Sequence, residues 1–312
     1  MTQATSSAEG TQHGWAGRVL EAIGGLYRVQ VDEVGEIEAS LRGRLKHAAR
    51  AVDRVVTGDV VMVSNTSSSG SWTIDKVQAR HSRLVRAAPG GQRPKVVVTN
   101  VDHVMVVLSV FQPAFDFRSA DRFLVLGEAC GIPSVLVLNK MDLPGASAVA
   151  QEVLRIYEQI GYAVLPTSTQ TGEGVERLRA LLEGSVSALV GPSGVGKSSI
   201  LNTLCPKLNL RTGPVSRRGG RGRHTTVGVC LLPLTTGGWV ADTPGFSDVS
   251  LWGVESRELS GAFPEFREPA KRCRFRGCTH SHEPDCAVLA AVEAAQIREE
   301  RYKSYRVLLE EK

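Results

Sequence analysis

The first part of the chain consists of short apolar or alternating runs that Gly, Asp and Ser residues separate. These runs cover residues 17–20, 26–31, 36–41, 59–63 and 72–77. Runs of this length between turn-forming residues predict β-strands. Roughly five strands between Trp15 and Val85 suit a small closed barrel, for which an OB-fold is the natural candidate and an SH3-like barrel the alternative.

The period of the pattern changes after residues 87–94, which read Ala-Ala-Pro-Gly-Gly-Gln-Arg-Pro and have the composition of a linker. Beyond this segment, apolar strands alternate with amphipathic helices. We predict strands at 104–110, 134–138, 162–165, 186–190, 227–234 and 239–241, and helices at 120–129, 148–160 and 174–183. This alternation predicts an α/β domain with a mostly parallel sheet and helices on both faces.

A glycine-rich segment joins the predicted strand 186–190 to a helix-like segment at 199–204, and its sequence GPSGVGKS has the G-x-x-x-x-G-K-[ST] spacing of a phosphate-binding loop. Glycines allow backbone N–H groups to wrap a polyphosphate closely. Lys197 would neutralise the β- and γ-phosphate oxygens, and the Ser198 hydroxyl is placed to bind Mg²⁺. The predicted nucleotide-binding residues of this segment are Gly191, Pro192, Ser193, Gly194, Val195, Gly196, Lys197, Ser198 and Ser199.

The strand 134–138 runs directly into a tetrapeptide, NKMD, that suits a guanine base. The Asp142 carboxylate can accept hydrogen bonds from guanine N1–H and N2–H₂, a pair that adenine lacks. Asn139 can brace the loop and contact the base N7, while the Lys140 side chain can lie over the base plane. At the end of a buried strand, in a chain with a phosphate loop, the tetrapeptide predicts guanine recognition.

A second loop, at residues 166–174, lies ahead of the predicted helix 174–183. Backbone N–H groups around Ser168 and Thr169 can support the carbonyl of a guanine base there. An ordinary strand-to-helix turn with a helix cap would have the same composition. Both interpretations remain open on these residues alone.

Two segments after the phosphate loop complete the pattern of a GTPase. The strand 239–241 ends in Asp-Thr-Pro-Gly, where Asp242 would hold Mg²⁺ and the Gly245 N–H would meet the γ-phosphate. The arginine-rich segment 217–226 ends in two threonines, of which we prefer Thr226 over Thr225 as a metal ligand. The predicted Mg²⁺ ligands are therefore Ser198, Thr226 and Asp242, and the combined elements indicate a GTP site.

The order of these elements along the chain is unusual, because the base-recognition loops precede the phosphate loop. A circular permutation, in which the old ends are joined and the chain is broken elsewhere, accounts for this order while leaving the site intact. The new break falls just after residues 242–245. A loop that rearranges on hydrolysis would therefore lead directly into the C-terminal part of the chain.

The residue that orients the attacking water is less evident. Phe246 follows Gly245 where many GTPases carry a glutamine, and an apolar ring cannot orient water. His224 is the nearest polar substitute, so the candidate catalytic residues are His224, Lys197 and Gly245. Contact with RNA or solvent is the alternative role for His224.

The chain is basic, with a net charge of +5 over 312 residues and a pI near 9.0, which favours an anionic partner such as nucleic acid. A group of basic residues in the barrel region fits that partner, although a solvated loop would have the same composition. The group comprises Arg42, Arg44, Lys46, Arg50 and Arg54. No apolar run approaches the ~20 residues of a membrane helix. Residues 1–14 lack a signal-peptide core, and we interpret them as the disordered tail of a cytoplasmic protein.

Three of the six cysteines cluster with a histidine near the end of the chain. The Cys-x4-Cys-x-His-x5-Cys pattern suits a closed, structural Zn²⁺ site with ligands Cys273, Cys278, His280 and Cys286, and His282 is a second candidate for the nitrogen. Reduced core cysteines or a redox pair are the alternatives. Zinc would hold a basic, RNA-contacting surface in one shape. The basic residues concerned are Arg267, Lys271, Arg272, Arg274 and Arg276, and residues 296–312 have the composition of a charged helix.

In combination, the motifs NKMD, GPSGVGKS, RHTT, DTPG and the zinc pattern stand in the order typical of one family. The chain resembles the ribosome-small-subunit-dependent GTPase family of bacteria over nearly everything from Trp15 to the C-terminus. The resemblance implies an OB barrel at 15–90, a permuted GTPase domain at 91–250 and a helical zinc domain at 251–312. It also implies a role in late maturation of the 30S subunit, GTP hydrolysis that the subunit stimulates, and a catalytic His224.

We therefore predict a cytoplasmic GTPase, monomeric and with one structural Zn²⁺, that binds the 30S subunit and 16S rRNA and is released after hydrolysis. One alternative is an RNA-binding module that uses GTP only as a structural ligand. Another is a permuted GTPase of large-subunit assembly, which the barrel and the position of the zinc pattern disfavour.

Overall fold

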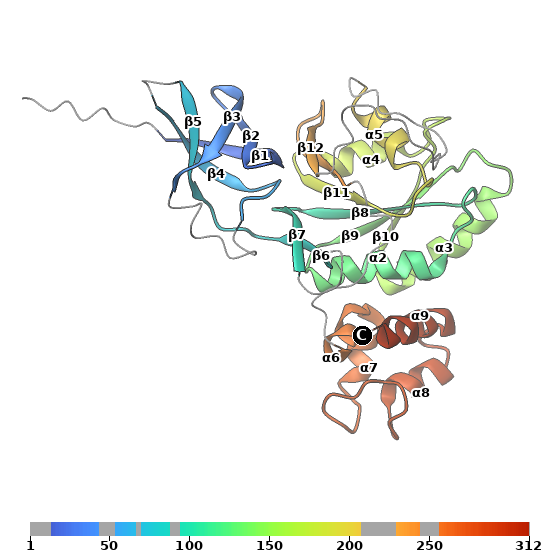
Figure 1. Ribbon diagram of the computed structural model, residues 1–312. Helices are drawn as coiled ribbons and strands as arrows, with labels where there is room; N and C mark the ends of the chain where they lie inside the picture. The colour runs from blue at the N-terminus through green and yellow to red at the C-terminus, as the bar shows by residue number, and fades with distance from the viewer. Residues whose placement is uncertain are drawn as a thin grey trace, which may run out of the picture.

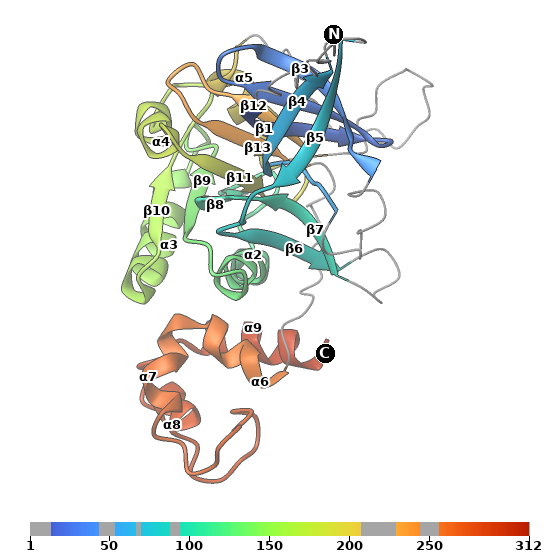
Figure 2. The same ribbon diagram turned by 90° about the vertical axis from the view of Figure 1, so that its left-hand side faces the viewer.

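The computed structural model describes residues 14–43, 54–66, 70–87, 94–206, 229–243 and 256–311. These residues form an N-terminal barrel, a larger sheet covered by helices, and a C-terminal group of helices (Figure 1). The barrel lies at one end of the larger sheet, and the C-terminal helices lie against helix α2 (Figure 2).

The N-terminal strands close into a barrel, as the alternating pattern predicts. They are β1 (Trp15–Ile23), β2 (Leu26–Val31), β3 (Gly35–Leu41), β4 (Val60–Thr66) and β5 (Ser71–Val77). Strand β1 pairs with both β2 and β4, and β3 pairs in parallel with β5, so the strand order β1-β2-β3-β5-β4 closes on β1. This pairing is that of an OB-type barrel. Its core contains Val19, Val29, Val61, Val63 and Ile74, each 0% exposed.

The α/β part of the sheet has the order β10-β9-β8-β11-β13-β12. The strands are β8 (His103–Ser109), β9 (Ser134–Asn139), β10 (Ala163–Pro166), β11 (Val186–Val190), β12 (Cys230–Pro233) and β13 (Trp239–Asp242). All are parallel except β12, which pairs antiparallel with β13. Strand β11, which leads into the glycine-rich loop, lies between β8 and β13. The predicted strands all occur, with ends that differ by one or a few residues.

Helices cover both faces of this sheet, as predicted (Figure 1). Helices α2 (Phe117–Ala129) and α3 (Ala146–Ile160) lie on one face, and α4 (Val175–Leu182) and α5 (Lys197–Leu204) lie on the other. Helix α2 begins three residues before the predicted start at 120, because the Asp116 carboxylate accepts hydrogen bonds from the N–H groups of Arg118 and Ser119. Among the residues that the structure describes, no helix is long and apolar enough to cross a membrane.

Two strands flank the segment predicted as a linker. Strands β6 (Arg83–Ala87) and β7 (Pro94–Thr99) pair antiparallel in a separate two-stranded sheet. The expected domain boundary between residues 90 and 91 falls between them, in a part of the chain outside the described ranges. The sequence pattern missed this hairpin because its first strand is short and rich in arginine.

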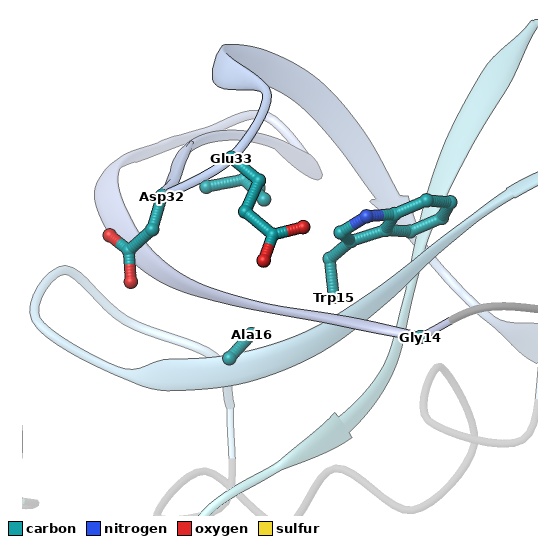
Figure 3. Close-up of a pocket in the computed structure, with 6 residues that line it drawn as sticks. Gly14, Trp15, Ala16, Asp32 and Glu33 are labelled. Carbon is teal, nitrogen blue, oxygen red and sulfur yellow. The ribbon is translucent and has the colours of Figure 1, made fainter.

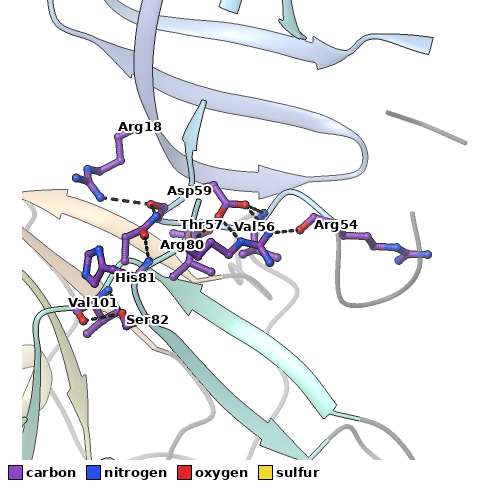
Figure 4. A network of polar contacts seen from close by, with 12 residues as sticks. Arg18, Arg54, Val56, Thr57, Asp59, Arg80, His81, Ser82 and Val101 are labelled. Atoms are coloured by element: carbon purple, nitrogen blue, oxygen red, sulfur yellow. Dashed lines mark hydrogen bonds and ion pairs between the residues drawn. The ribbon is translucent and has the colours of Figure 1, made fainter. Parts of the chain in front are cut away.

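A buried ion pair joins the barrel to the segment that leads into the α/β sheet (Figure 4). The Asp59 side chain is fully buried and accepts hydrogen bonds from Arg80 Nε at 2.7 Å and Arg80 Nη2 at 2.8 Å. It also accepts from the Thr99 hydroxyl at 2.8 Å and from the Val56 N–H at 2.9 Å. A buried carboxylate satisfied in this way fixes the barrel against β7, because removing any donor would leave charge unpaired.

The barrel also contacts the edge strand of the α/β sheet directly. Glu21 of β1 pairs with Cys230 of β12, and the Arg28 guanidinium donates to Cys230 Sγ at 2.9 Å. The Thr57 hydroxyl donates to the Val229 carbonyl at 2.9 Å. Since β12 follows residues 217–226, the barrel is attached to the sheet immediately after the arginine-rich segment.

The C-terminal part is mainly helical, as predicted. It contains α6 (Ser256–Leu259), α7 (Arg267–Ala270), α8 (Ala287–Glu293), α9 (Glu299–Glu310) and the 3-10 turns η1 (Ser260–Ala262) and η2 (Pro264–Phe266). Arg301 of α9 is 1% exposed; its guanidinium donates to Asp121 of α2 at 2.5 Å and to Glu265 at 2.6 Å. The guanidinium carbon also lies 4.7 Å from the centre of the Phe263 ring. These contacts attach the helical region to α2.

Candidate nucleotide and metal sites

The glycine-rich loop approaches neighbouring backbone too closely for side chains. Gly191 has φ +142°, and a Cβ there would lie 2.1 Å from the Val107 carbonyl oxygen of β8. Gly196 has φ +101°, and a Cβ there would lie 2.3 Å from Asn139 Nδ2. Both positions therefore require glycine, for backbone conformation and for space. The loop then enters α5 at Lys197, so the first helical N–H groups face the predicted phosphate position.

Lys197 occupies the interior of the loop. Its Nζ donates to the carbonyl oxygens of Gly191 and Pro192, both at 2.6 Å. Burial lowers the pKa of Lys197 to about 8, although the nearby Asp242 carboxylate acts in the opposite direction. A polyphosphate would replace the carbonyl oxygens with charged ones and favour the protonated amine.

Asp242 lies beside this amine at the end of β13. Strand register places Asp242 opposite Leu189, just before the glycine-rich loop. Burial raises the pKa of the Asp242 carboxyl, and the charge of Lys197 lowers it. The adjacent Thr243 hydroxyl donates to the Leu189 carbonyl at 2.6 Å and fixes the strand end. Lys197 and Asp242, separated in sequence, therefore meet at the carboxyl edge of the sheet.

The predicted base-recognition tetrapeptide is bonded to the glycine-rich loop. Asn139 is 1% exposed, and its Nδ2 donates to the Val195 carbonyl at 2.9 Å. Lys140 Nζ donates to the Gly194 carbonyl at 2.8 Å. The bracing that the sequence suggested for Asn139 is thus present in the structure, whereas its contact with a base stays a prediction.

Asp142 and Ser168 also lie together. The fully buried Ser168 hydroxyl donates to Asp142 Oδ1 at 2.6 Å and accepts from the N–H groups of Gln170 and Thr171, both at 3.2 Å. The hydrogen bond to Oδ1 restricts rotation of the Asp142 carboxylate and leaves its Oδ2 for a ligand. Thr169 lies in the same turn, half-buried.

One contributor to this edge escaped the sequence analysis. The loop after β8 places the Gln112 carbonyl as a second acceptor of Lys140 Nζ, and Pro113 Cδ lies 3.6 Å from where a Cβ on Gly194 would be. The sequence pattern assigns no role to Ser109. In the structure, its hydroxyl donates a hydrogen bond to the Pro113 carbonyl at 2.8 Å. The Gln112-Pro113 pair, shortly after the buried strand β8, is the sequence feature that could have indicated this contribution.

Several predicted site residues lie outside the part of the chain that the structure describes. They are His224, Thr225, Thr226, Gly245 and Phe246. Their roles therefore stay predictions, as does the choice between Thr225 and Thr226. The described nucleotide-site residues, from Asn139 to Asp242, converge on one edge of the sheet.

The four predicted zinc ligands form one cluster. The ligand atoms of Cys273, Cys278, His280 and Cys286 all lie within 4.8 Å of one another. The Sγ atoms of Cys273 and Cys286 are 3.9 Å apart, and His280 Nδ1 lies 3.4 Å from Cys286 Sγ and 3.6 Å from Cys273 Sγ. Tetrahedral Zn²⁺ with its usual bond lengths requires S–S separations of about 3.8 Å and S–N separations of about 3.6 Å. The cluster therefore fits a tetrahedral ion.

Neighbouring groups hold this cluster in place. Tyr302 donates to the His280 carbonyl at 2.9 Å, and Tyr305 donates to the Thr279 carbonyl at 2.6 Å. Burial raises the pKa of the Cys278 thiol to about 12, so binding of a cation would displace thiol protons. His282, the second candidate, is exposed and its Nδ1 lies 2.7 Å from the Ser281 hydroxyl. The geometry favours His280.

The barrel carries a pocket of about 480 Å³ beside the start of β1 (Figure 3). Trp15, Asp32 and Glu33 are among its lining residues, and the Trp15 ring packs edge-on against Trp72 at 5.1 Å. The carboxylates of Asp32 and Glu33 in the lining disfavour phosphate groups in this pocket.

The basic residues predicted for the barrel are only partly described. Arg42 forms an ion pair with Asp75 at 2.9 Å, and Arg54 is exposed. Arg44, Lys46 and Arg50 fall outside the described ranges. An RNA-binding face on the barrel therefore stays a prediction.

Nucleotide binding should take up a proton above pH 8. In the free protein, a Lys197 pKa of about 8 leaves the amine about 0.8 deprotonated at pH 8.5 and about 0.1 at pH 7. Phosphate oxygens should restore the proton, so we expect uptake of most of one proton per site at pH 8.5 and little at pH 7. Titration calorimetry of Mg²⁺-GDP in two buffers of different ionisation enthalpy measures this uptake. Lys197→Arg, which does not titrate here, is the control; equal uptake at both pH values would contradict the assignment.

The purified chain should contain one zinc per molecule. His280→Ala should lose that zinc, because three thiolates alone leave the tetrahedral site incomplete. His282→Ala, the matched control two residues away, should keep it. Elemental analysis of the purified variants decides, and retention by His280→Ala with loss by His282→Ala would reverse the ligand assignment.

Known proteins resemble this chain over most of its length. A family model described as RsgA GTPase matches residues 77–252. The small ribosomal subunit biogenesis GTPase RsgA of Gemmatimonas aurantiaca is 44% identical over 297 residues, which are 95% of this chain and 96% of that protein. The protein of the same name from Moorella thermoacetica is 41% identical over 296 residues, with 95% and 96% covered.

Two solved structures are similar throughout. YjeQ from Thermotoga maritima has a TM-score of 0.79 at 33% identity, covering 96% of this chain and 98% of that one. YloQ, described as a circularly permuted GTPase, has a TM-score of 0.74 at 29% identity, covering 98% and 97%. These similarities confirm the permuted GTPase fold that the order of the motifs predicts. The chain belongs to the RsgA GTPase family.

Proposed function

We propose that this protein hydrolyses GTP during biogenesis of the small ribosomal subunit, the role that the names of its relatives state for them. The observation that carries the proposal is the convergence at one sheet edge of the glycine-rich loop, the Asn139–Asp142 loop and Asp242. Membership of the RsgA GTPase family supports the same reaction. We extend this proposal to late action in 30S maturation, to stimulation of GTP hydrolysis by the subunit and to release of the protein after hydrolysis.

The predicted site residues have distinct proposed roles, including three that lie outside the described part of the chain: His224, Thr226 and Gly245. Lys197 exchanges its loop carbonyl partners for β- and γ-phosphate oxygens. Ser198, Asp242 and Thr226 would hold Mg²⁺, which would neutralise charge on the phosphates when bound. Asp142, oriented by Ser168, accepts the guanine N–H groups. The remaining loop residues from Gly191 to Ser199 bind the phosphates through their backbone N–H groups. Gly245 meets the γ-phosphate, and His224 positions the attacking water.

The remaining elements suit a ribosomal partner. We propose that the barrel and the Cys273–Cys286 region contact 16S rRNA, since zinc would hold the basic C-terminal surface in one shape. We further propose that the protein acts as a monomer in the cytoplasm. With the domain limits proposed above, the barrel at 15–90 and the zinc domain at 251–312 contact RNA, and the domain at 91–250 hydrolyses GTP.

GTP turnover should rise when small subunits are added. We expect an increase of about 10-fold or more with 30S subunits, because a partner that completes a GTPase site accelerates hydrolysis by orders of magnitude. Release of inorganic phosphate under multiple turnover measures it, with 50S subunits as the matched control. Lys197→Ala should abolish turnover. No stimulation, or equal stimulation by 50S subunits, would contradict the coupling, and turnover that survives Lys197→Ala would indicate a contaminant.

Guanine selectivity should reside in Asp142. Asp142→Asn should bind GTP about 100-fold more weakly and gain affinity for xanthosine triphosphate, because the amide presents a donor where the carboxylate presented an acceptor. Ser168→Ala, which frees the carboxylate and also removes the acceptor of the Gln170 and Thr171 N–H groups, should weaken GTP binding by about 5-fold. Displacement of a fluorescent GDP analogue measures both. Unchanged preference for GTP in Asp142→Asn would refute the assigned role.

A further inference from the structure

The loop between the first two cysteines of the metal cluster carries an exposed aromatic ring. Phe275 is 44% exposed, whereas Phe263, Phe266 and Tyr305 of the same region are fully buried. A single exposed apolar side chain is common on protein surfaces and by itself indicates nothing. The case for a function of Phe275 therefore depends on how the ring is held and on what surrounds it.

The metal cluster fixes the ends of this loop. Cys273 and Cys278 bracket it, and the Cys278 N–H donates to the Phe275 carbonyl at 3.3 Å. Gly277, with φ +78°, completes the turn. The ring is thus presented on a short closed turn rather than on a long loop. A ligand that contacts it would have little chain entropy to remove, which favours binding.

Arginines flank Phe275 along the chain, and one of them lies over its ring. The Arg274 guanidinium carbon lies 5.5 Å from the ring centre, and Arg274 is held there by an ion pair with Asp285 at 2.9 Å. Arg272 and Arg276 are also exposed, and neither forms an ion pair with any residue that the structure describes. The turn therefore combines one flat apolar ring with two guanidinium groups available to an anionic partner.

We propose that Phe275 stacks on an unpaired RNA base while Arg272 and Arg276 contact the adjoining phosphates. This proposal rests on the proposed ribosomal role and names the part of the RNA that the metal module recognises. Stacking on an aromatic ring requires a base that is free of its helix, because the base faces of duplex RNA are covered by their neighbours. The guanidinium groups supply the charge that the phosphates on each side of such a base require.

The chemistry separates RNA from a protein partner. A protein surface would take Phe275 into an apolar pocket, where a leucine retains much of the contact. A nucleobase needs the flat π-face, which leucine lacks and tyrosine keeps. Two substitutions at one position therefore distinguish the two kinds of partner.

The experiment measures the affinity of the full-length protein, in the GTP-analogue state, for 30S subunits. The variants are Phe275→Ala, Phe275→Leu and Phe275→Tyr, with Leu181→Ala as a control because Leu181 is an apolar side chain with similar exposure, 41%, on α4. The zinc content of each variant is measured alongside. We expect the Ala and Leu variants to bind about 5-fold or more weakly. Phe275→Tyr and Leu181→Ala should stay within about 2-fold of the parent protein, and all variants should keep their zinc.

Wild-type binding to 30S subunits reports the proposed function, and the differences among variants report this inference. Binding by Phe275→Leu equal to wild type would overturn base stacking in favour of a protein contact, and unchanged binding by Phe275→Ala would overturn any role for the ring. If wild-type protein does not bind subunits, a second probe decides. The tryptophan fluorescence of Phe275→Trp should be quenched by a 12-nucleotide single-stranded RNA and not by a 12-base-pair duplex; no difference between the two RNAs would exclude stacking.

Discussion

The nucleotide edge of this protein depends on how closely the glycine-rich loop approaches β8 and Asn139. At Gly191 and Gly196 no side chain fits, so the path of the loop is set by backbone on one side and by an amide on the other. The bonds from Asn139 to Val195 and from Lys140 to Gly194 then connect the loop that would bind phosphate to the loop that would bind base. The two ends of the site behave as one rigid unit.

The barrel is attached to this unit through the edge of the sheet. Strand register puts Glu21 of β1 opposite Cys230, Cys230 opposite Asp242, and Asp242 opposite Leu189. A single row of paired residues thus crosses from the barrel to the strand that enters the glycine-rich loop. On the other side, Arg301 attaches the C-terminal helices to α2. Each flanking part is attached through a buried carboxylate, Asp59 or Asp121, that pairs with an arginine and would be left without that partner if the contact were broken.

Much of this arrangement could be predicted from local patterns. Strand 186–190 was located to the residue, and the clustering of Cys273, Cys278, His280 and Cys286 could be predicted because these residues form a short, continuous motif. The contacts that join the parts were not predictable in this way. Arg301 and Asp121 are separated by 180 residues, and Thr57 and Val229 by 172, so nothing local marks them as partners. The β6–β7 hairpin was missed for a different reason, since its arginines and prolines mask the period of a strand.

The central position of β11 has a consequence for how the protein is made. In the finished sheet β11 lies between β8 and β13, yet it follows β8, β9 and β10 in the chain. During synthesis from the N-terminus, β8 and β9 can pair early, while one edge of β8 waits for a strand that leaves the ribosome about eighty residues later. The side chains of β8 are apolar, and the backbone N–H and C=O groups along that edge are unpaired in the meantime, which is the situation that favours aggregation. Because of the permuted chain order, the strand that stays unpaired on one edge during synthesis is β8. The completed nucleotide site requires the same strand, since the glycine-rich loop packs against it.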